Sequence, residues 1–167
     1  MPPHETYPRD LQRPRATVAS RILLYLSFHT RFREAFEVPE ELTQEGIGRG
    51  VEVSRAHAAL VLKELQERGL VEYRTAHVRG HRVRKRVYFL TPAGLKEAEE
   101  ILEALRGLTW SLDGETVPFE RAMKTLQGLG LRRSQAAVLL LSRETVETEE
   151  VVSLRSTGKP PVPAAGP

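Results

Sequence analysis

One stretch decides the fold, residues 51–94, which read VEVSRAHAALVLKELQERGLVEYRTAHVRGHRVRKRVYFLTPAG. Ser54 can cap a helix over residues 55–68, because its hydroxyl accepts a hydrogen bond from an unpaired amide of the first turn. The apolar positions of this helix fall at i, i+3, i+4 and i+7, the spacing of one buried face. They are Ala58, Val61, Leu62 and Leu65. Gly69 then ends the helix, because glycine readily adopts the left-handed conformation that stops it.

The hydrophobic period changes after that glycine. Two segments, 70–74 and 86–90, are rich in β-branched and aromatic side chains. This pattern predicts a β-hairpin over residues 71–90 with its tip near Gly80. The Thr-Pro pair at 91–92 begins a further helix, since threonine suits the N-cap and proline the first helical position.

A shorter helix precedes the stretch over 55–68. Thr43 can cap it, and Gly50 suits the bend that follows. Two short helices joined by a tight turn are the arrangement of a helix-turn-helix. Upstream, an apolar stripe predicts a helix over residues 17–28. The stripe consists of Val18, Ile22, Tyr25 and Leu26. The order of elements predicts a winged helix-turn-helix, a mainly α structure of the α+β class with a small β-hairpin wing.

The whole chain divides into four predicted segments. These are a flexible N-terminal arm (1–15), a winged helix-turn-helix domain (16–106), a small helical appendage of unknown role (107–142) and a disordered tail (143–167). The arm holds four prolines and few apolar residues. In the appendage, Asp113-Gly114 favours a tight hairpin turn, and residues 118–127 and 132–142 have helical patterns. The tail is poor in apolar residues and ends in a proline-rich run, which predicts disorder.

The composition excludes some classes of protein. Of the 167 residues, 40% are hydrophobic and 28% are charged, which is enough apolar material for a packed core. The longest wholly apolar run, Ala136–Leu141, is far shorter than the roughly 18 residues of a membrane-spanning helix, so no membrane association is predicted. The chain has no cysteine, which excludes disulfides and thiolate metal sites. We expect a cytoplasmic protein.

Positive charge is concentrated in the first half. Residues 1–90 carry sixteen Lys and Arg against eleven Asp and Glu, whereas residues 91–167 carry nine against eleven. Six cations lie between Tyr73 and Val87 with no acid among them: Arg74, Arg79, Arg82, Arg84, Lys85 and Arg86. A basic hairpin beside a helix-turn-helix pattern indicates nucleic-acid binding, because each cation can neutralise a backbone phosphate.

Four short segments resemble the MarR-like winged-helix domains that are common in archaea, and the resemblance covers roughly residues 16–106. The segments are Leu42–Ile47 (LTQEGI), Val53–His57 (VSRAH), Lys63–Val71 (KELQERGLV) and Lys85–Gly94 (KRVYFLTPAG). The resemblance implies binding of duplex DNA to regulate transcription. Similar domains also precede signalling ATPases in archaea, ahead of a proline-rich linker, so a DNA-binding regulatory part of such a system is an alternative.

We expect residues 55–68 to act as the recognition helix and residues 71–90 as the basic wing. Arg55 can serve guanine or a phosphate, and His57 can reach a phosphate. Family members commonly have polar or basic residues where Ala59 and Leu60 stand, so we expect phosphate contacts to dominate the affinity. The predicted DNA-binding residues are Thr43, Gln44, Ser54, Arg55, His57, Lys63, Arg79, Arg82, Arg84 and Arg86.

Two features point to protein partners. The apolar Leu60, together with residues 107–142, would also suit a protein-interaction module, which is the main alternative to DNA binding. The helix after Thr91 carries an apolar stripe that is spaced for helix packing. The stripe consists of Leu95, Ala98, Leu102 and Leu105. It predicts either packing against the helix over 17–28 or the seam of a homodimer, and the resemblance to dimeric regulators favours the homodimer.

The sequence contains no pattern that indicates catalysis, a cofactor or a metal. His77 and His81 flank the hairpin tip, but two histidines alone make a weak metal site. The glycines within residues 46–50 lack the spacing of a dinucleotide loop. The Gly-Lys pair at 158–159 lacks the upstream glycine and the following Ser or Thr of a phosphate-binding loop. We therefore expect a protein that is not an enzyme.

Overall fold

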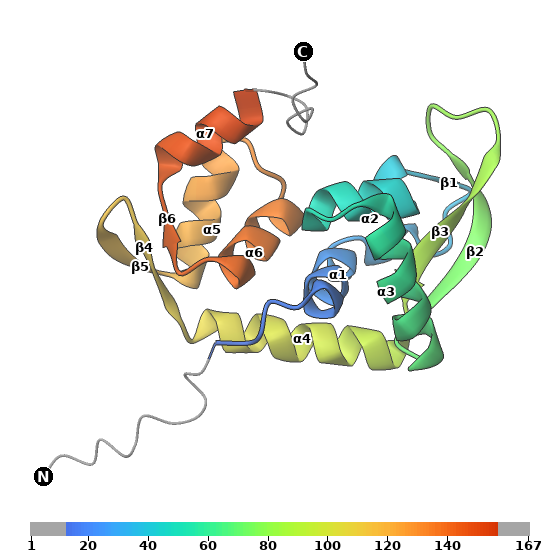
Figure 1. Cartoon of the computed structure of the whole chain (residues 1–167), viewed down its shortest axis with the longest axis horizontal. Helices are drawn as coiled ribbons and strands as arrows, with labels where there is room; N and C mark the ends of the chain where they lie inside the picture. The colour runs from blue at the N-terminus through green and yellow to red at the C-terminus, as the bar shows by residue number, and fades with distance from the viewer. Residues whose placement is uncertain (1–12, 157–167) are drawn as a thin grey trace, which may run out of the picture.

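The computed structural model describes residues 13–156 and confirms the α+β class (Figure 1). Within this range the α-helices are α1 (Val18–Ser27), α2 (Gln44–Val51), α3 (Arg55–Glu67), α4 (Pro92–Arg106), α5 (Phe119–Gly128), α6 (Arg133–Ser142) and α7 (Thr148–Ser156). The strands are β1 (Glu37–Val38), β2 (Val71–Val78), β3 (Arg84–Leu90), β4 (Thr109–Leu112), β5 (Glu115–Pro118) and β6 (Thr145–Val146). Two short 3-10 helices, η3 (Thr30–Phe32) and η4 (Glu40–Leu42), follow α1. No helix in this range is long and apolar enough to cross a membrane.

The first sheet contains the predicted hairpin. Strands β2 and β3 pair antiparallel, with Tyr73 opposite Tyr88. Gly80 lies in the loop between them with a φ of 83°, a left-handed value that favours glycine. Strand β1 pairs in parallel with the outer edge of β2, where Val38 lies beside Val78, so the sheet order is β1-β2-β3.

Helix α1 lies at the centre of the molecule between two clusters of buried side chains (Figure 1). The first core contains Ile22 and Tyr25 of α1 and joins this helix to α2, α3, α4 and the first sheet. The second core contains Leu24 of α1 and joins it to α4, α5, α6 and the second sheet. One helix therefore belongs to both cores.

Helix α4 packs along α1 and buries its apolar stripe there. Ala98 belongs to the first core and Leu105 to the second, and both side chains are fully buried. Leu95 and Leu102, which are partly buried, each pack against one of these cores. Packing within the chain thus accounts for the stripe, and the predicted homodimer would need a different surface.

The second sheet has the order β5-β4-β6 and covers the end of the second core. Asp113 and Gly114 form the predicted tight turn between β4 and β5, with φ values of 50° and 83°. Trp110 of β4 is buried, and its indole Nε1 donates a hydrogen bond to the carbonyl of Leu140 at 2.8 Å. This bond ties the sheet to α6.

The prediction of a disordered tail from Arg143 is wrong for β6 and α7. Two valines, Val146 and Val151, anchor these elements because their side chains are buried in the second core. Asp113 caps the start of α7, where its carboxylate accepts hydrogen bonds from the amide of Thr148 at 2.8 Å and from its hydroxyl at 2.6 Å. Ordered structure therefore continues to Ser156, and residues 157–167 lie outside the described residues.

The flexible arm predicted for residues 1–15 needs a correction at its end. Its first twelve residues lie outside the described part. The guanidinium of Arg13 donates to the carbonyls of Leu140 and Arg143, both at 3.1 Å, and lies 4.8 Å from the ring centroid of Trp110. A guanidinium with two acceptors and an aromatic face is held in place, so the chain is fixed from this residue onward.

Candidate nucleic-acid interface

Helices α2 and α3 are joined by a turn at Glu52. This residue has a φ of 62°, and its amide bonds back to the carbonyl of Arg49 at 3.3 Å. The hydroxyl of Ser54 then accepts a hydrogen bond from the amide of His57 at 3.1 Å and starts α3. Ser54 is therefore the N-cap of α3, and this hydrogen bond occupies the hydroxyl that was predicted to contact DNA.

The glycines of α2 allow close packing. The bend predicted at Gly50 is wrong, because Gly50 lies inside α2, where a Cβ atom would come within 2.2 Å of the Tyr25 ring. A Cβ atom on Gly46 would come within 2.1 Å of the carbonyl oxygen of Glu40. These positions let α2 press against α1 and η4, and this packing explains the glycines without any ligand.

One side of α3 is open to solvent. Its exposed residues are Arg55, Ala56, His57, Leu60, Lys63, Glu64 and Glu67. Leu60 is the most exposed apolar side chain of the helix, with 69% of its surface accessible. The side chains between Arg55 and Lys63 thus include apolar groups that offer no hydrogen bonds to base edges.

Two cations of the basic run, Arg74 and Lys85, lie on the inner face of the hairpin with the buried Ala76 and Val87. Along β2, Arg74 alternates with outward side chains and lies opposite the buried Val87 of β3. Its guanidinium donates to the carbonyl of Ala35 at 2.7 Å and lies 5.2 Å from the ring centroid of Phe89. Arg74 therefore fastens the segment before β1 to the hairpin and does not belong to the basic surface predicted for the wing.

Two arginines of β3 lie on the other face of the hairpin. Arg86 lies opposite Thr75, and its guanidinium is 4.1 Å from the ring centroid of Tyr73. Arg84, two residues earlier on the same face, donates to the carbonyl of Thr75 at 2.9 Å. Neither contact involves a carboxylate, so both guanidinium groups keep their positive charge available.

A groove of about 500 Å³ separates α3 from the hairpin. It is lined by Gln44, Ala59, Lys63, Gln66, Glu67, Tyr73, Arg86 and Tyr88. Lys63 comes from α3 and Arg86 from β3, so each of the two elements supplies a cation, against the single carboxylate of Glu67. Such a groove can receive an anionic backbone.

Three glutamates pair with the remaining cations of this surface. The ion pairs are Glu37–Arg79 (3.3 Å), Glu40–Arg49 (2.6 Å), Glu45–Arg55 (3.3 Å) and Glu45–Lys85 (4.0 Å). Hydrogen bonding from Arg49 lowers the pKa of the Glu40 carboxyl. Sequence reasoning missed these glutamates because they precede the basic run by some thirty to forty-five residues and meet it only in the fold.

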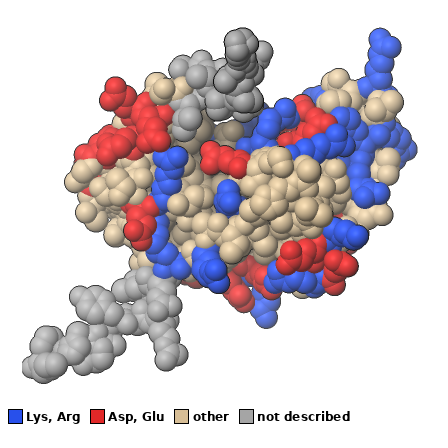
Figure 2. All heavy atoms as spheres, in the orientation of Figure 1, with Lys and Arg blue, Asp and Glu red and all other residues tan. Residues whose placement is uncertain are grey.

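Four of the six predicted Lys and Arg contacts have no carboxylate partner in the described part of the chain. They are Lys63, Arg82, Arg84 and Arg86. Figure 2 shows Lys and Arg side chains gathered over the end of the molecule where the hairpin lies, whereas acidic side chains gather over α7. Positive charge therefore remains on the hairpin after the ion pairs are made.

The start of α2 contributes one of its two predicted residues. Thr43 is buried, and its hydroxyl accepts from the amide of Gly46 at 3.1 Å and donates to the carbonyl of Glu40 at 2.7 Å. The prediction that its side chain anchors a phosphate is therefore wrong. Gln44 lines the groove and donates to the hydroxyl of Tyr88 at 2.8 Å.

The two histidines near the hairpin tip face different carboxylates. His77 lies 4.0 Å from Glu37, and His81 lies 3.8 Å from Glu40. Between residues 13 and 156, no three His, Cys, Asp or Glu side chains gather closely enough to hold a metal ion. Each histidine can instead form an ion pair with its glutamate when it is protonated.

Comparison of the chain with models of known protein families, with curated proteins and with solved structures finds no match.

Proposed function

We propose that this chain is a winged helix-turn-helix protein that binds duplex DNA and regulates transcription. In this proposal α2 and α3 are the helix-turn-helix, and α3 lies in the major groove. The β2–β3 hairpin is the wing and follows the phosphate backbone. The order of the elements supports the proposal, as does the basic surface that α3 and the hairpin share.

One observation carries the proposal: both elements supply cations that have no carboxylate partner among residues 13–156, and these cations open onto one groove. Lys63 and Arg86 line the groove between α3 and β3, and Arg84 lies two residues from Arg86 on the same strand face. A phosphate backbone in this groove would meet a cation on each side. Each phosphate that is neutralised releases condensed counterions, which makes binding favourable and sensitive to salt.

This surface has few side chains that can recognise bases. Ala56 and Leu60 offer α3 no hydrogen-bonding groups, and Arg55 is paired with Glu45. Because base edges are distinguished by their donors and acceptors, we propose that phosphate contacts supply most of the affinity.

The test is a titration of labelled duplex DNA by fluorescence anisotropy at several salt concentrations. Four phosphate contacts predict a slope of about −3.6 in a plot of log K against log salt, so affinity falls roughly a hundredfold between about 50 and 200 mM. The variant R82A/R84A/R86A should weaken all duplex sequences alike and reduce the slope to about −0.9.

A control variant separates this local effect from a general loss of charge. R106A/R121A/R143A also removes three arginines, but each of these is paired with a glutamate outside the groove. It should leave the slope unchanged. Absent or salt-insensitive binding, or equal losses in both triple variants, would contradict the proposal.

The exposure of Leu60 favours a second candidate, a protein-interaction module. This side chain is 69% exposed in the middle of the open side of α3. If duplex DNA does not bind, this apolar position becomes the main feature of α3.

The predicted homodimer is examined separately by analytical ultracentrifugation, and a monomer at micromolar concentration would contradict it.

A further inference from the structure

Phe36 is an exposed aromatic residue beside the hairpin. It directly precedes β1, and 85% of its surface is accessible, the highest value among the large apolar side chains that are described. Its ring is stacked against His77, with the ring centroids 6.3 Å apart and the planes 22° from parallel. One side of the ring thus faces His77 of β2, and most of the ring surface is open to solvent.

Phe36 belongs to a series of rings and cations along β2. Tyr73 is 42% exposed and lies on the same face as His77, four residues away, which is roughly 13 Å along the strand. Arg86 covers one side of the Tyr73 ring. Arg84, which lies opposite His77, donates to the carbonyl of Thr75, between Tyr73 and His77. Aromatic and cationic side chains therefore alternate on this face of the hairpin.

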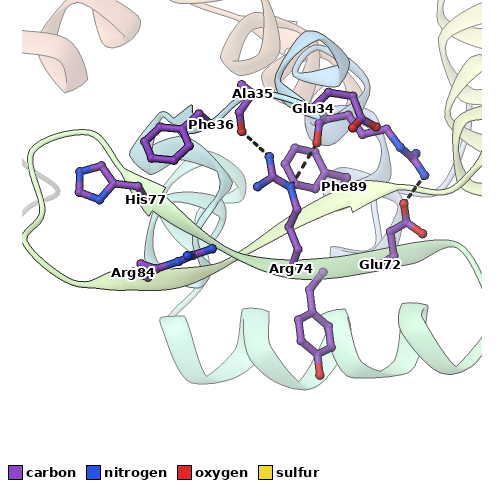
Figure 3. Close-up of a pocket in the computed structure, with 10 residues that line it drawn as sticks. Glu34, Ala35, Phe36, Glu72, Arg74, His77, Arg84 and Phe89 are labelled. Carbon is purple, nitrogen blue, oxygen red and sulfur yellow. Dashed lines mark hydrogen bonds and ion pairs between the residues drawn. The ribbon is translucent and has the colours of Figure 1, made fainter.

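These side chains border a second groove, of about 530 Å³, on the outer edge of β2 (Figure 3). Its lining includes the rings of Phe36, Tyr73 and His77 and three arginines, Arg33, Arg74 and Arg84. It also includes two carboxylates, Glu34 and Glu72, of which Glu72 pairs with Arg33. Figure 3 shows the rings of Phe36 and His77 side by side at one end and Arg74 crossing the middle toward the carbonyl of Ala35. The volume lies within the range of small-molecule and nucleotide sites.

We propose that this groove binds single-stranded nucleic acid and that an unpaired base stacks on Phe36. Every base has a π-face that can stack on an aromatic ring, but in a duplex these faces are covered by neighbouring base pairs. Arg84 at the border of the groove would meet the phosphate next to the stacked base. The groove shares only Tyr73 with the lining of the groove between α3 and β3, and Phe36 lines only this one, so the inference does not rest on duplex binding.

The combination of groups favours nucleic acid over an apolar peptide. A peptide side chain would need only the apolar surface of Phe36, whereas the neighbouring Arg84 adds a positive charge with no carboxylate partner in the described residues. Aromatic faces beside the cation of Arg84 match the alternating bases and phosphates of a single strand.

The test measures anisotropy of a fluorescein-labelled oligothymidylate about a dozen nucleotides long. The unchanged protein should bind it, and F36A should weaken binding by roughly 5- to 150-fold, the range that stacking of one base on an aromatic ring supplies. F36L should weaken it similarly, since leucine keeps apolar area without a π-face, while F36W should retain binding. V152A, which trims an exposed valine on α7, serves as the control and should leave binding unchanged.

Each outcome decides the proposal. No binding of the oligothymidylate, or equal binding by F36A and the unchanged protein, overturns it. Full binding by F36L would assign the site to an apolar ligand and also overturn it. Duplex DNA is titrated in parallel, and F36A should not change its affinity. If the unchanged protein binds the oligothymidylate but not duplex DNA, the proposed function is contradicted and this inference is left intact.

Discussion

Replacing Glu45 with Gln should tighten duplex binding at low salt. The Glu45 carboxylate lies 3.3 Å from Arg55 of α3 and 4.0 Å from Lys85 of β3. It therefore neutralises two cations, one from each element of the proposed interface, and competes with phosphate for them. E45Q removes the negative charge but keeps the size and hydrogen-bonding capacity of the side chain.

The expected change in salt dependence follows from the number of cations that E45Q frees to contact phosphate. Two further phosphate contacts would steepen the slope of log K against log salt by about 1.8. Raising the salt from about 50 to 200 mM should then reduce the advantage of E45Q over the unchanged protein by roughly tenfold. The substitution also removes an acidic group from the first turn of α2, which costs about 0.3–1 kcal/mol in the free energy of unfolding.

The assay is the same anisotropy titration, with urea unfolding as a check on stability. E103Q is the matched control: it also adds one unit of positive charge, but Glu103 pairs with Arg106 of α4, away from the groove. Only E45Q should change the slope. An unchanged or flatter slope in a folded E45Q protein would refute the idea that Glu45 competes with the DNA backbone. An equal gain of duplex affinity in E103Q would show that the change comes from net charge alone.

Two further predictions concern stability. Burial lowers the pKa of His29, whose Nδ1 donates to the carbonyl of Tyr25 at 3.0 Å. The contribution of the neutral His29 to the free energy of unfolding is therefore complete above the pKa of about 6.5 that histidine has in the unfolded chain. It is lost as the pH falls below that value. The urea midpoint, followed by fluorescence of the single tryptophan Trp110, should fall from pH 7 toward about pH 5.5, and an equal fall in H29Q would assign the effect to another group. Hydrogen bonds from Thr148 lower the pKa of Asp113, so this cap of α7 is complete above the usual aspartate pKa and weakens below it. D113N, which tolerates the left-handed backbone, should speed amide exchange in the first turn of α7 but not in α3, and unchanged exchange in α7 would show that the cap contributes nothing.

The sequence predicted those elements whose ends carry local chemical signals. Helix α3 begins after the capping Ser54, and Gly69 beyond its end has a φ of 74°. Helix α4 begins after Thr91, whose hydroxyl accepts from the amide of Gly94 at 3.1 Å. In each case one or two neighbouring residues determine the hydrogen bond that starts the helix or the backbone angle that ends it, so the signal is present in the sequence alone.

Elements that depend on distant partners were not predicted. Strands β1 and β6 have two residues each, which is too short to show an alternating pattern, and they form by pairing with β2 and β4. Helix α7 has a charged first turn, and among its residues 148–153, whose burial is described, only Val151 belongs to the second core. Its cap, Asp113, is 35 residues away in the chain.

The candidate site was predicted at the level of its region but not of its individual charges. The basic run between Tyr73 and Val87 correctly indicates where positive charge is concentrated. Whether Arg74 points inward depends on the register of β2 against β3 and on the carbonyls of the segment before β1. Likewise, Glu45 reduces the charge of Arg55 and Lys85 only because the fold brings α2 between α3 and β3.

Because α1 belongs to both cores, the half of the molecule built around the first core and the half built around the second depend on each other for stability. A fragment cut after α4 would expose Leu24 and Leu105, which are fully buried against the second half. The ion pair between Glu41 and Arg132 at 3.1 Å forms a second link, from η4 to the start of α6. Helix α6 packs against α1, which also contacts α2 and α3, so a molecule that displaced α6 would disturb the packing of helices in the other half of the protein.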